Sequence, residues 1–215
     1  MRELIERWHR GWCVARRVPA AEDVGGGLRV RCLQPGRDIE YVAYGPDDLD
    51  GLAERVRAEP EVAWLTVPTH DPGRTAGLLQ ERGLALLKRA EQLMTIELSE
   101  HPASKLDGPY HLEVAVDRDV VTATVRHESG EAAAGGTMGL VGTDAIADRI
   151  ETAAAHRRRG LASVVMGELA RTAAEHGARH GILIASEDGQ RLYPRLGWRP
   201  EAAVLIAEAG HAPFG

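Results

Sequence analysis

The sequence predicts an α/β (α+β) fold in which a mixed central sheet is flanked by helices. The first reason is that short apolar runs at strand spacing alternate with amphipathic runs at helical spacing. The second is that the order of these runs over residues 1–100 is echoed over residues 108–215. The third is the stretch between them, which contains Pro102 and Gly108 and is typical of a linker. We therefore expect two similar halves in tandem.

Composition and charge argue against several classes of function. A formal net charge of −6 over 215 residues argues against a general nucleic-acid binder. Cys13 and Cys32 are too few for a metal cluster or a disulfide framework, and two reduced thiols are favoured over one disulfide. No apolar run approaches the roughly 20 residues of a membrane span, and the charged N-terminus has no signal region. We expect a cytoplasmic protein with no metal, membrane or nucleic-acid partner.

The first element is a helix over residues 1–17. Leu4, Ile5, Trp8 and Trp12 recur at helical spacing and form one apolar face. The two tryptophans are interpreted as core or interdomain packing in preference to a ligand-stacking face.

Strand and helix patterns alternate through the rest of the first half. His70 and Asp71 lie between two prolines, and we interpret them as a turn and not as a catalytic pair. The expected elements are strands at 28–33, 38–44 and 62–67, helices at 47–58 and 73–82, and one long strand at 86–98.

The second half begins with a run of strands joined by short turns. Gly135 and Gly136 interrupt one strand and indicate a bulge or a close approach to the backbone. The expected elements are strands at 112–116, 121–125, 132–141 and 146–152, a helix at 161–176, a strand at 181–186, a short helix at 188–196 and a last strand at 202–207.

A basic turn connects the strand ending at Thr152 to the helix beginning at Leu161. The first N–H groups of a helix have no intrahelical partner, and the helix dipole places positive potential there. Gly160 allows a bulky anion to approach the backbone, and Arg157, Arg158 and Arg159 add positive charge. The stretch therefore predicts a diphosphate site, although a solvated helix cap is the alternative.

Two sequence signatures in the right order resemble the GNAT acetyltransferase superfamily. Arg157-x-x-Gly160-x-Ala162 is similar to its pyrophosphate loop, R/Q-x-x-G-x-G/A, and is weak alone. The stretch from Ser186 to Trp198 is similar to its second signature, N-x-x-A-x-x-L-Y-x-x-x-G-F/W. The resemblance is sharpest over residues 150–200 and implies the GNAT fold with acetyl-CoA as cosubstrate.

The resemblance also implies roles for particular residues. Main-chain groups of Ile150 and Thr152 would bind the pantetheine arm and polarise the thioester. Tyr193 would act as the general acid that protonates the departing thiolate. The remaining residues implied to bind the cosubstrate are Arg157, Arg158, Arg159, Gly160, Leu161, Ala162, Ser163 and Ser186.

The chain departs from the family pattern at two positions, and the general base is not fixed by any motif. Ser186 stands where the family usually has Asn, and Gly189 where it has Ala, so weakened contacts to pantetheine are expected. Strand parity favours Glu151 over Asp148 as base, with ordinary surface charge as the alternative for both. Water relays also serve as base in this family.

The first half has no family motif and is interpreted as a degenerate GNAT-like half. Asp117 to Asp119 link the first strands of the second half directly, where the family usually has two helices. The acidic stretch Gly45 to Asp48 occupies the place of the basic loop. We therefore expect residues 1–100 to wall the acceptor side, and residues 108–215 to bind acetyl-CoA.

The function implied is transfer of an acetyl group to a primary amine of a small molecule or peptide. An acyltransferase that uses a longer acyl-CoA remains an alternative, as does a non-catalytic acyl-CoA-binding or sensing protein. Tyr193 argues against the binding protein, because binding alone needs no acid. The protein could be a monomer or a homodimer.

Overall fold

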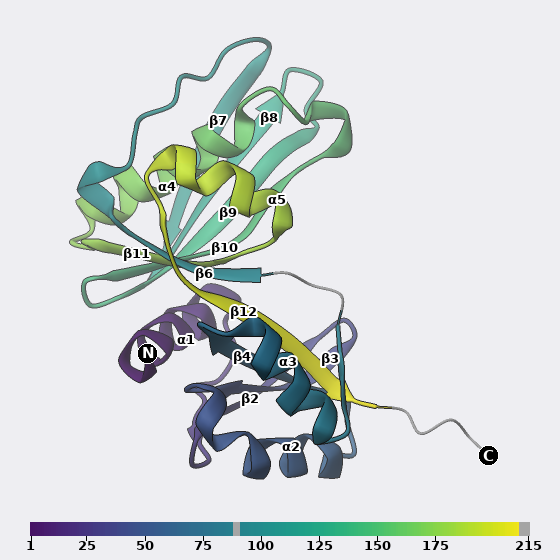
Figure 1. Cartoon of the computed structure of the whole chain (residues 1–215). Coiled ribbons are helices and arrows are strands. Elements are labelled where there is room, and N and C mark those ends of the chain that lie inside the picture. The colour runs from purple at the N-terminus through teal and green to yellow at the C-terminus, as the bar shows by residue number, and fades with distance from the viewer. Residues whose placement is uncertain (88–90, 211–215) are drawn as a thin grey trace.

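One mixed sheet runs through the described part of the chain, residues 1–87 and 91–210, in this computed structural model (Figure 1). Its order is β1-β2-β3-β4-β12-β6-β11-β10-β9-β8-β7, and β5 pairs with β12. The strands are β1 (Glu22–Asp23), β2 (Gly27–Gln34), β3 (Arg37–Ala43), β4 (Ala63–Thr69), β5 (Leu84–Leu86), β6 (Glu91–Glu97), β7 (Tyr110–Asp117), β8 (Val120–His127), β9 (Ala132–Val141), β10 (Asp144–Thr152), β11 (His180–Ala185) and β12 (Arg199–Ala209).

Helices cover both faces of this sheet. The α-helices are α1 (Arg2–Arg16), α2 (Leu49–Ala58), α3 (Pro72–Glu81), α4 (Leu161–Glu175) and α5 (Glu187–Leu192). Short 3₁₀ helices are η1 (Pro46–Asp48), η2 (Leu98–Glu100), η3 (Ala154–His156) and η4 (Tyr193–Leu196). The α/β class expected from the sequence is confirmed, with mixed strand directions and flanking helices.

The two halves of the sheet mirror each other about the β12–β6 pair. On one side β4 pairs antiparallel with β12 and parallel with β3, and β3 pairs antiparallel with β2. On the other side β11 pairs antiparallel with β6 and parallel with β10, and β10 pairs antiparallel with β9. Helix α2 connects the parallel pair of the first half, and α4 connects that of the second. Two halves with the same order of strand pairings therefore share one sheet.

Each half of the sheet is completed by the last strand of the other half of the chain. Strand β6 is the last strand of the first half in the chain, but it pairs with β11 over residues 92–97. Strand β12 is the last strand of the second half, but it pairs with β4 and β5. Figure 1 shows β12, in yellow, crossing from one half to the other.

The single long strand expected at 86–98 is wrong. The structure has two strands there, β5 and β6, and residues 88–90 lie outside the described part of the chain. Both strands pair with β12, β5 at its residues 207–209 and β6 at its residues 199–204. The segment forms two strands because β5 pairs within the first half of the sheet, whereas β6 also pairs with β11 of the second half. The two-residue strand β1 precedes the first strand expected from the sequence.

Helix α1 lies on one face of the sheet and packs against strands of both halves. Its residues Ile5, Trp8 and Trp12 are buried with Val42 of β3 and Ile146 of β10. This confirms that the tryptophans pack between the halves. Because neighbouring residues of a strand point to opposite faces, Tyr41 and Ala145 belong to the other side of the sheet.

The approach of α1 to β9 and β10 depends on two glycines. A Cβ added at Gly139 of β9 would collide with the carbonyl oxygen of Gly11 and lie 2.7 Å from the amide nitrogen of Ala15. A Cβ at Gly11 would lie 2.6 Å from Cγ1 of Ile146. The helix backbone therefore rests almost directly on the sheet.

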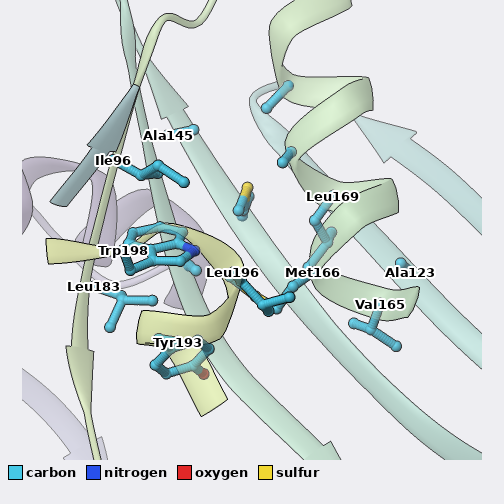
Figure 2. Close-up of a cluster of buried hydrophobic side chains, with 14 of the residues drawn as sticks. Ile96, Ala123, Ala145, Val165, Met166, Leu169, Leu183, Tyr193, Leu196 and Trp198 are labelled. Atoms are coloured by element: carbon cyan, nitrogen blue, oxygen red, sulfur yellow. The ribbon is translucent and has the colours of Figure 1, made fainter. Parts of the chain in front are cut away.

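Helices α2 to α5 lie on the face opposite α1. The apolar stripe expected on α4 is confirmed, because Leu161, Val165, Leu169 and Ala173 are all fully buried. Figure 2 shows this core, in which Tyr193, Leu196 and Trp198 from the end of α5 and beyond pack toward α4. Strand β11 and helix α4 thereby fix the position of Tyr193.

Candidate active site

Strands β10 and β11 run together at first and then diverge. Their parallel pairing covers only Asp144–Ile146 of β10, although that strand continues to Thr152. Beyond this point β10 has a bulge, where Arg149 and Ile150 lie opposite the single residue Gly136 of β9. Arg149 has a positive φ of 55°. The main chain of β10 between the bulge and Thr152 therefore borders a gap between the two strands.

Gly136 leaves room for the Ile150 side chain at this bulge. A Cβ added there would collide with the side chain of Ile150 and lie 3.4 Å from its Cα. The glycine pair in the sequence indicated a bulge, and the structure has it on the neighbouring strand β10.

The basic turn wraps around the N-terminus of α4. Arg158 and Gly160 both have positive φ, 61° and 75°. No side chain caps the helix, so its first N–H groups are not occupied by a capping residue. A Cβ at Gly160 would have no atom within 4 Å, so the space above this residue is open to a ligand. The side chains of Arg157 to Arg159 are exposed.

His156 anchors this turn, and sequence reasoning missed it. The ring is buried, its Nδ1 lies 2.9 Å from the hydroxyl of Tyr110, and its Nε2 lies 3.4 Å from Glu131. The only signal in the sequence was its place directly before the three arginines. The turn is thus held from inside the protein while its arginines face solvent.

A cavity of about 880 Å³ extends from this turn into the gap between β10 and β11. Eleven of the twelve site residues expected from the sequence line it, and Arg159 does not. The expected residues in the lining are Ile150, Glu151, Thr152, Arg157, Arg158, Gly160, Leu161, Ala162, Ser163, Ser186 and Tyr193. Sequence reasoning missed Thr124, residues 132–135, Arg149, Ala153, Asp188, Gly189 and Leu192 as lining residues.

Tyr193 is the most buried titratable group of this cavity. Burial raises the pKa of Tyr193 to about 12, and the nearby carboxylate of Asp148 adds to the shift. The hydroxyl therefore stays neutral and protonated at physiological pH. A Cβ added at Gly189 would lie 2.6 Å from the Tyr193 ring. The glycine found where the family usually has alanine thus leaves room for the ring.

Ser186 has a structural task besides its place in the cavity. Its side chain caps α5 by accepting from the amide of Gly189 at 3.4 Å. The hydroxyl hydrogen is not used in this bond and can be donated to another group.

A second cavity of about 430 Å³ meets the first at five residues. The shared residues are Arg149, Ile150, Glu151, Ser186 and Tyr193. The second cavity lies on the α1 side and receives Trp8, Trp12, Arg16, Arg37, Glu40 and Thr66 from the first half. Trp8 and Trp12 were expected to pack and not to form a ligand-stacking face, but they also line this cavity. No sequence pattern indicated Arg16, Arg37, Glu40 or Thr66, because these residues come together only through the shared sheet.

Asp148 and Glu151 are the two carboxylates near Tyr193 that the sequence offered as general base. Asp148 is nearly buried, and both of its oxygens accept hydrogen bonds from Arg16, at 2.8 and 2.9 Å. Glu151 is exposed and lines both cavities. The bulge breaks the strand alternation between them, so the parity argument from the sequence does not separate the two residues.

The described residues hold no group of three or more His, Cys, Asp or Glu side chains arranged to bind a metal ion. Both cysteines are buried and unpaired. None of the described helices is long and apolar enough to cross a membrane.

Comparison with known proteins identifies the family. Residues 90–198 match the model of the acetyltransferase (GNAT) family, and no curated protein matches the chain. The fold is similar to a GCN5-related N-acetyltransferase from Kribbella flavida, with a TM-score of 0.72 at 15% identity, covering 97% of this chain and 96% of that one.

Two further solved structures have the same fold. A putative GNAT acetyltransferase from Novosphingobium aromaticivorans gives a TM-score of 0.61 at 18% identity, covering 96% of this chain and 97% of the other. A tandem GNAT protein from the clavulanic acid biosynthesis pathway gives 0.60 at 14% identity, covering 89% and 82%. With the family model matching half of its length, the chain belongs to the GNAT acetyltransferase family.

Proposed function

We propose that this protein is an N-acetyltransferase that moves an acetyl group from acetyl-CoA to a primary amine of a small molecule or peptide. The observation that carries the proposal is the position of Tyr193, which borders both cavities where they meet. A donor in the larger cavity and an acceptor in the smaller one would approach each other beside this hydroxyl.

The larger cavity suits the extended shape and charge of acetyl-CoA. Its diphosphate would lie at the N-terminus of α4, bound by the amides of residues 158–163 with Arg157 and Arg158 nearby. The pantetheine arm would follow the main chain of Ile150 and Thr152 into the gap between the strands. Ser186 would donate its hydroxyl to an amide of that arm.

The reaction would proceed by direct attack of the amine on the thioester carbonyl. The attack forms a tetrahedral oxyanion, whose collapse breaks the carbon–sulfur bond and releases CoA thiolate. Tyr193 would act as the general acid toward the sulfur. Because its pKa is raised to about 12, the proton stays on the phenol until negative charge develops beside it.

Glu151 is the proposed route for the proton that leaves the amine. Its carboxylate is exposed at the junction of the cavities, whereas that of Asp148 is occupied by Arg16. Glu151 would act directly or through a water molecule.

The first test is thermal unfolding with acetyl-CoA, CoA and adenosine diphosphate. A ligand that binds only the native state raises its stability by about 2.7 kcal/mol at a hundredfold excess over Kd. We expect both CoA forms to raise Tm, and Gly160→Val to abolish the shift. In that variant a branched side chain would adopt an unfavourable positive φ and enter the open space above the turn.

Release of thiol on adding amines then separates the enzyme from a binding protein. If Tm of the folded protein does not change with either CoA form, the basic turn is a helix cap and not a diphosphate site. A Tm shift without thiol release from any amine would favour an acyl-CoA-binding protein, and release only from longer acyl-CoAs would change the donor.

A further inference from the structure

We propose that the acceptor is an amine that also carries a carboxylate, and that Arg37 of the first half binds this carboxylate. The inference rests on the proposed function, because it names the substrate class of the smaller cavity. It begins from the arrangement of Arg37, Glu40 and Thr66 in the wall of that cavity.

Arg37 is held in one orientation with donors to spare. Its Nη1 donates to Glu40 Oε2 at 2.6 Å, and Thr66 donates to the other oxygen of Glu40 at 2.7 Å. Both oxygens of this buried carboxylate are therefore satisfied. Arg37 Nε is buried and has no acceptor among the described residues. A guanidinium has five N–H groups, so the pair leaves Arg37 with unused donors suited to a carboxylate.

The Trp12 ring of the cavity is already occupied by guanidinium groups. The Trp12 ring already has Arg16 at 4.8 Å and Arg37 at 5.6 Å from its centroid. Arg37 also lies 4.8 Å from the Trp64 ring centroid. Trp12 and Trp64 thus fix the guanidinium groups, and the Trp12 ring is not available to a cationic acceptor.

Groups of both charges line the cavity. Tyr193, Glu151 and Arg149 lie at the junction with the larger cavity, where the reacting amine must be placed. Arg37 belongs to β3 of the first half, across the cavity from β10. An amine at the junction would face the exposed carboxylate of Glu151, and a carboxylate farther along would face the unused donors of Arg37. A volume of about 430 Å³ is enough for an amino acid or a short peptide but not for a protein domain.

The test compares acceptors that differ only in the carboxylate. Leucine, leucinamide and 3-methylbutylamine are assayed with acetyl-CoA by thiol release in the wild-type protein. We expect kcat/KM for leucine to exceed that for the other two at least tenfold, with the difference mainly in KM. Arg37→Lys should reduce the preference, because an ammonium cannot reproduce the planar fork.

A double variant, Arg37→Met with Glu40→Met, removes the charge without leaving a buried carboxylate unpaired. It should abolish the preference while its Tm still rises with CoA. Arg31→Met is the matched control, since Arg31 is exposed on the neighbouring strand and pairs with Glu61. If the double variant does not fold, Arg37→Lys decides the matter.

Binding of the product keeps this inference separate from the proposed function. Calorimetry should detect N-acetyl-leucine but not N-acetyl-leucinamide, and the difference should disappear in the Arg37 variants. Equal binding of acid and amide, or a preference that survives loss of Arg37, would overturn the carboxylate site. If no acceptor gives thiol release but N-acetyl-leucine still binds in a way that depends on Arg37, the proposed acetyltransferase function is wrong and the carboxylate site stands.

Discussion

Tyr193 lies at the junction of the two cavities and carries the hydroxyl proposed as the general acid. Tyr193→Phe removes it and leaves the packed ring in place, so we expect kcat to fall about 100-fold, as for loss of a general acid. The affinity for CoA, measured by calorimetry, should remain within about twofold. Tyr41→Phe is the control, because that hydroxyl bonds Glu59 away from the cavities and its loss should leave kcat unchanged. Full activity in Tyr193→Phe would assign the acid to another group.

His9 lies in the buried contact of α1 and makes the free energy of unfolding depend on pH. Burial, with the nearby charge of Arg37, lowers the pKa of His9 to about 4. In the unfolded chain the imidazole takes up a proton near pH 6.5. Between these values the unfolded state binds more protons, so the free energy of unfolding falls as the pH falls.

We expect a loss of about 2 kcal/mol from this group between pH 7 and pH 5, measured by urea unfolding. His9→Gln should flatten that part of the pH profile, whereas the same change at exposed His70 should not. An identical slope in His9→Gln and the parent would place the pH dependence elsewhere.

At the scale of elements, the contact of α1 with the sheet determines both the stability of the fold and the geometry of the acceptor site. Gly139→Ala would place a methyl group against the backbone of α1, so the helix must move outward. We expect a loss of about 1–3 kcal/mol in the free energy of unfolding, as for overpacked cores. Because Trp8 and Trp12 of α1 line the smaller cavity, KM for the acceptor should rise while CoA still binds.

Gly51→Ala is the matched control for that substitution. Gly51 is exposed in α2, and a Cβ there would meet no atom within 4 Å. Alanine is favoured over glycine in a helix by roughly 1 kcal/mol, so this variant should gain stability. A Gly139→Ala protein as stable as the parent would show that α1 adjusts without strain.

Local patterns in the sequence were sufficient for most elements. Leu161, Val165, Leu169 and Ala173 predicted α4 and its buried face correctly, because helical periodicity depends only on neighbours along the chain. The division of residues 86–98 into β5 and β6 was not predictable. It depends on β12, more than a hundred residues later, which pairs with both strands.

The residues of the candidate site likewise fall into those that local sequence patterns predicted and those that they did not. Eleven residues of the larger cavity were expected, because they belong to a contiguous motif or a neighbouring strand. Arg16 of α1 and Arg37 and Glu40 of β3 in the smaller cavity belong to no motif, and the two elements are far apart from β10 in the sequence. Likewise, the bulge at Arg149 decides which carboxylates reach the junction, and only the glycine pair of β9 hinted at it.

For the whole molecule, the exchanged strands couple the two halves. The division into residues 1–100 and 108–215 remains our proposal for their ancestry and roles. Neither range contains all the strands that its part of the sheet uses, since β12 pairs with β4 and β6 pairs with β11. We expect one cooperative unfolding transition.

Hydrogen exchange of β4 and β11 peptides, followed in increasing urea by mass spectrometry, checks this expectation. The two peptides should lose protection at the same urea midpoint. Separate midpoints would mean that each half is stable without its borrowed strand.

The position of β12 has a further consequence for biosynthesis. A ribosome releases the chain from its N-terminus, so β4 is available long before the strand that will lie beside it. Until residues 199–209 have emerged, the inner edge of β4 has no partner, and such an edge invites pairing with other chains. Protection of the nascent first half, by a chaperone or by rapid translation of the second, is therefore part of what this topology requires of the cell.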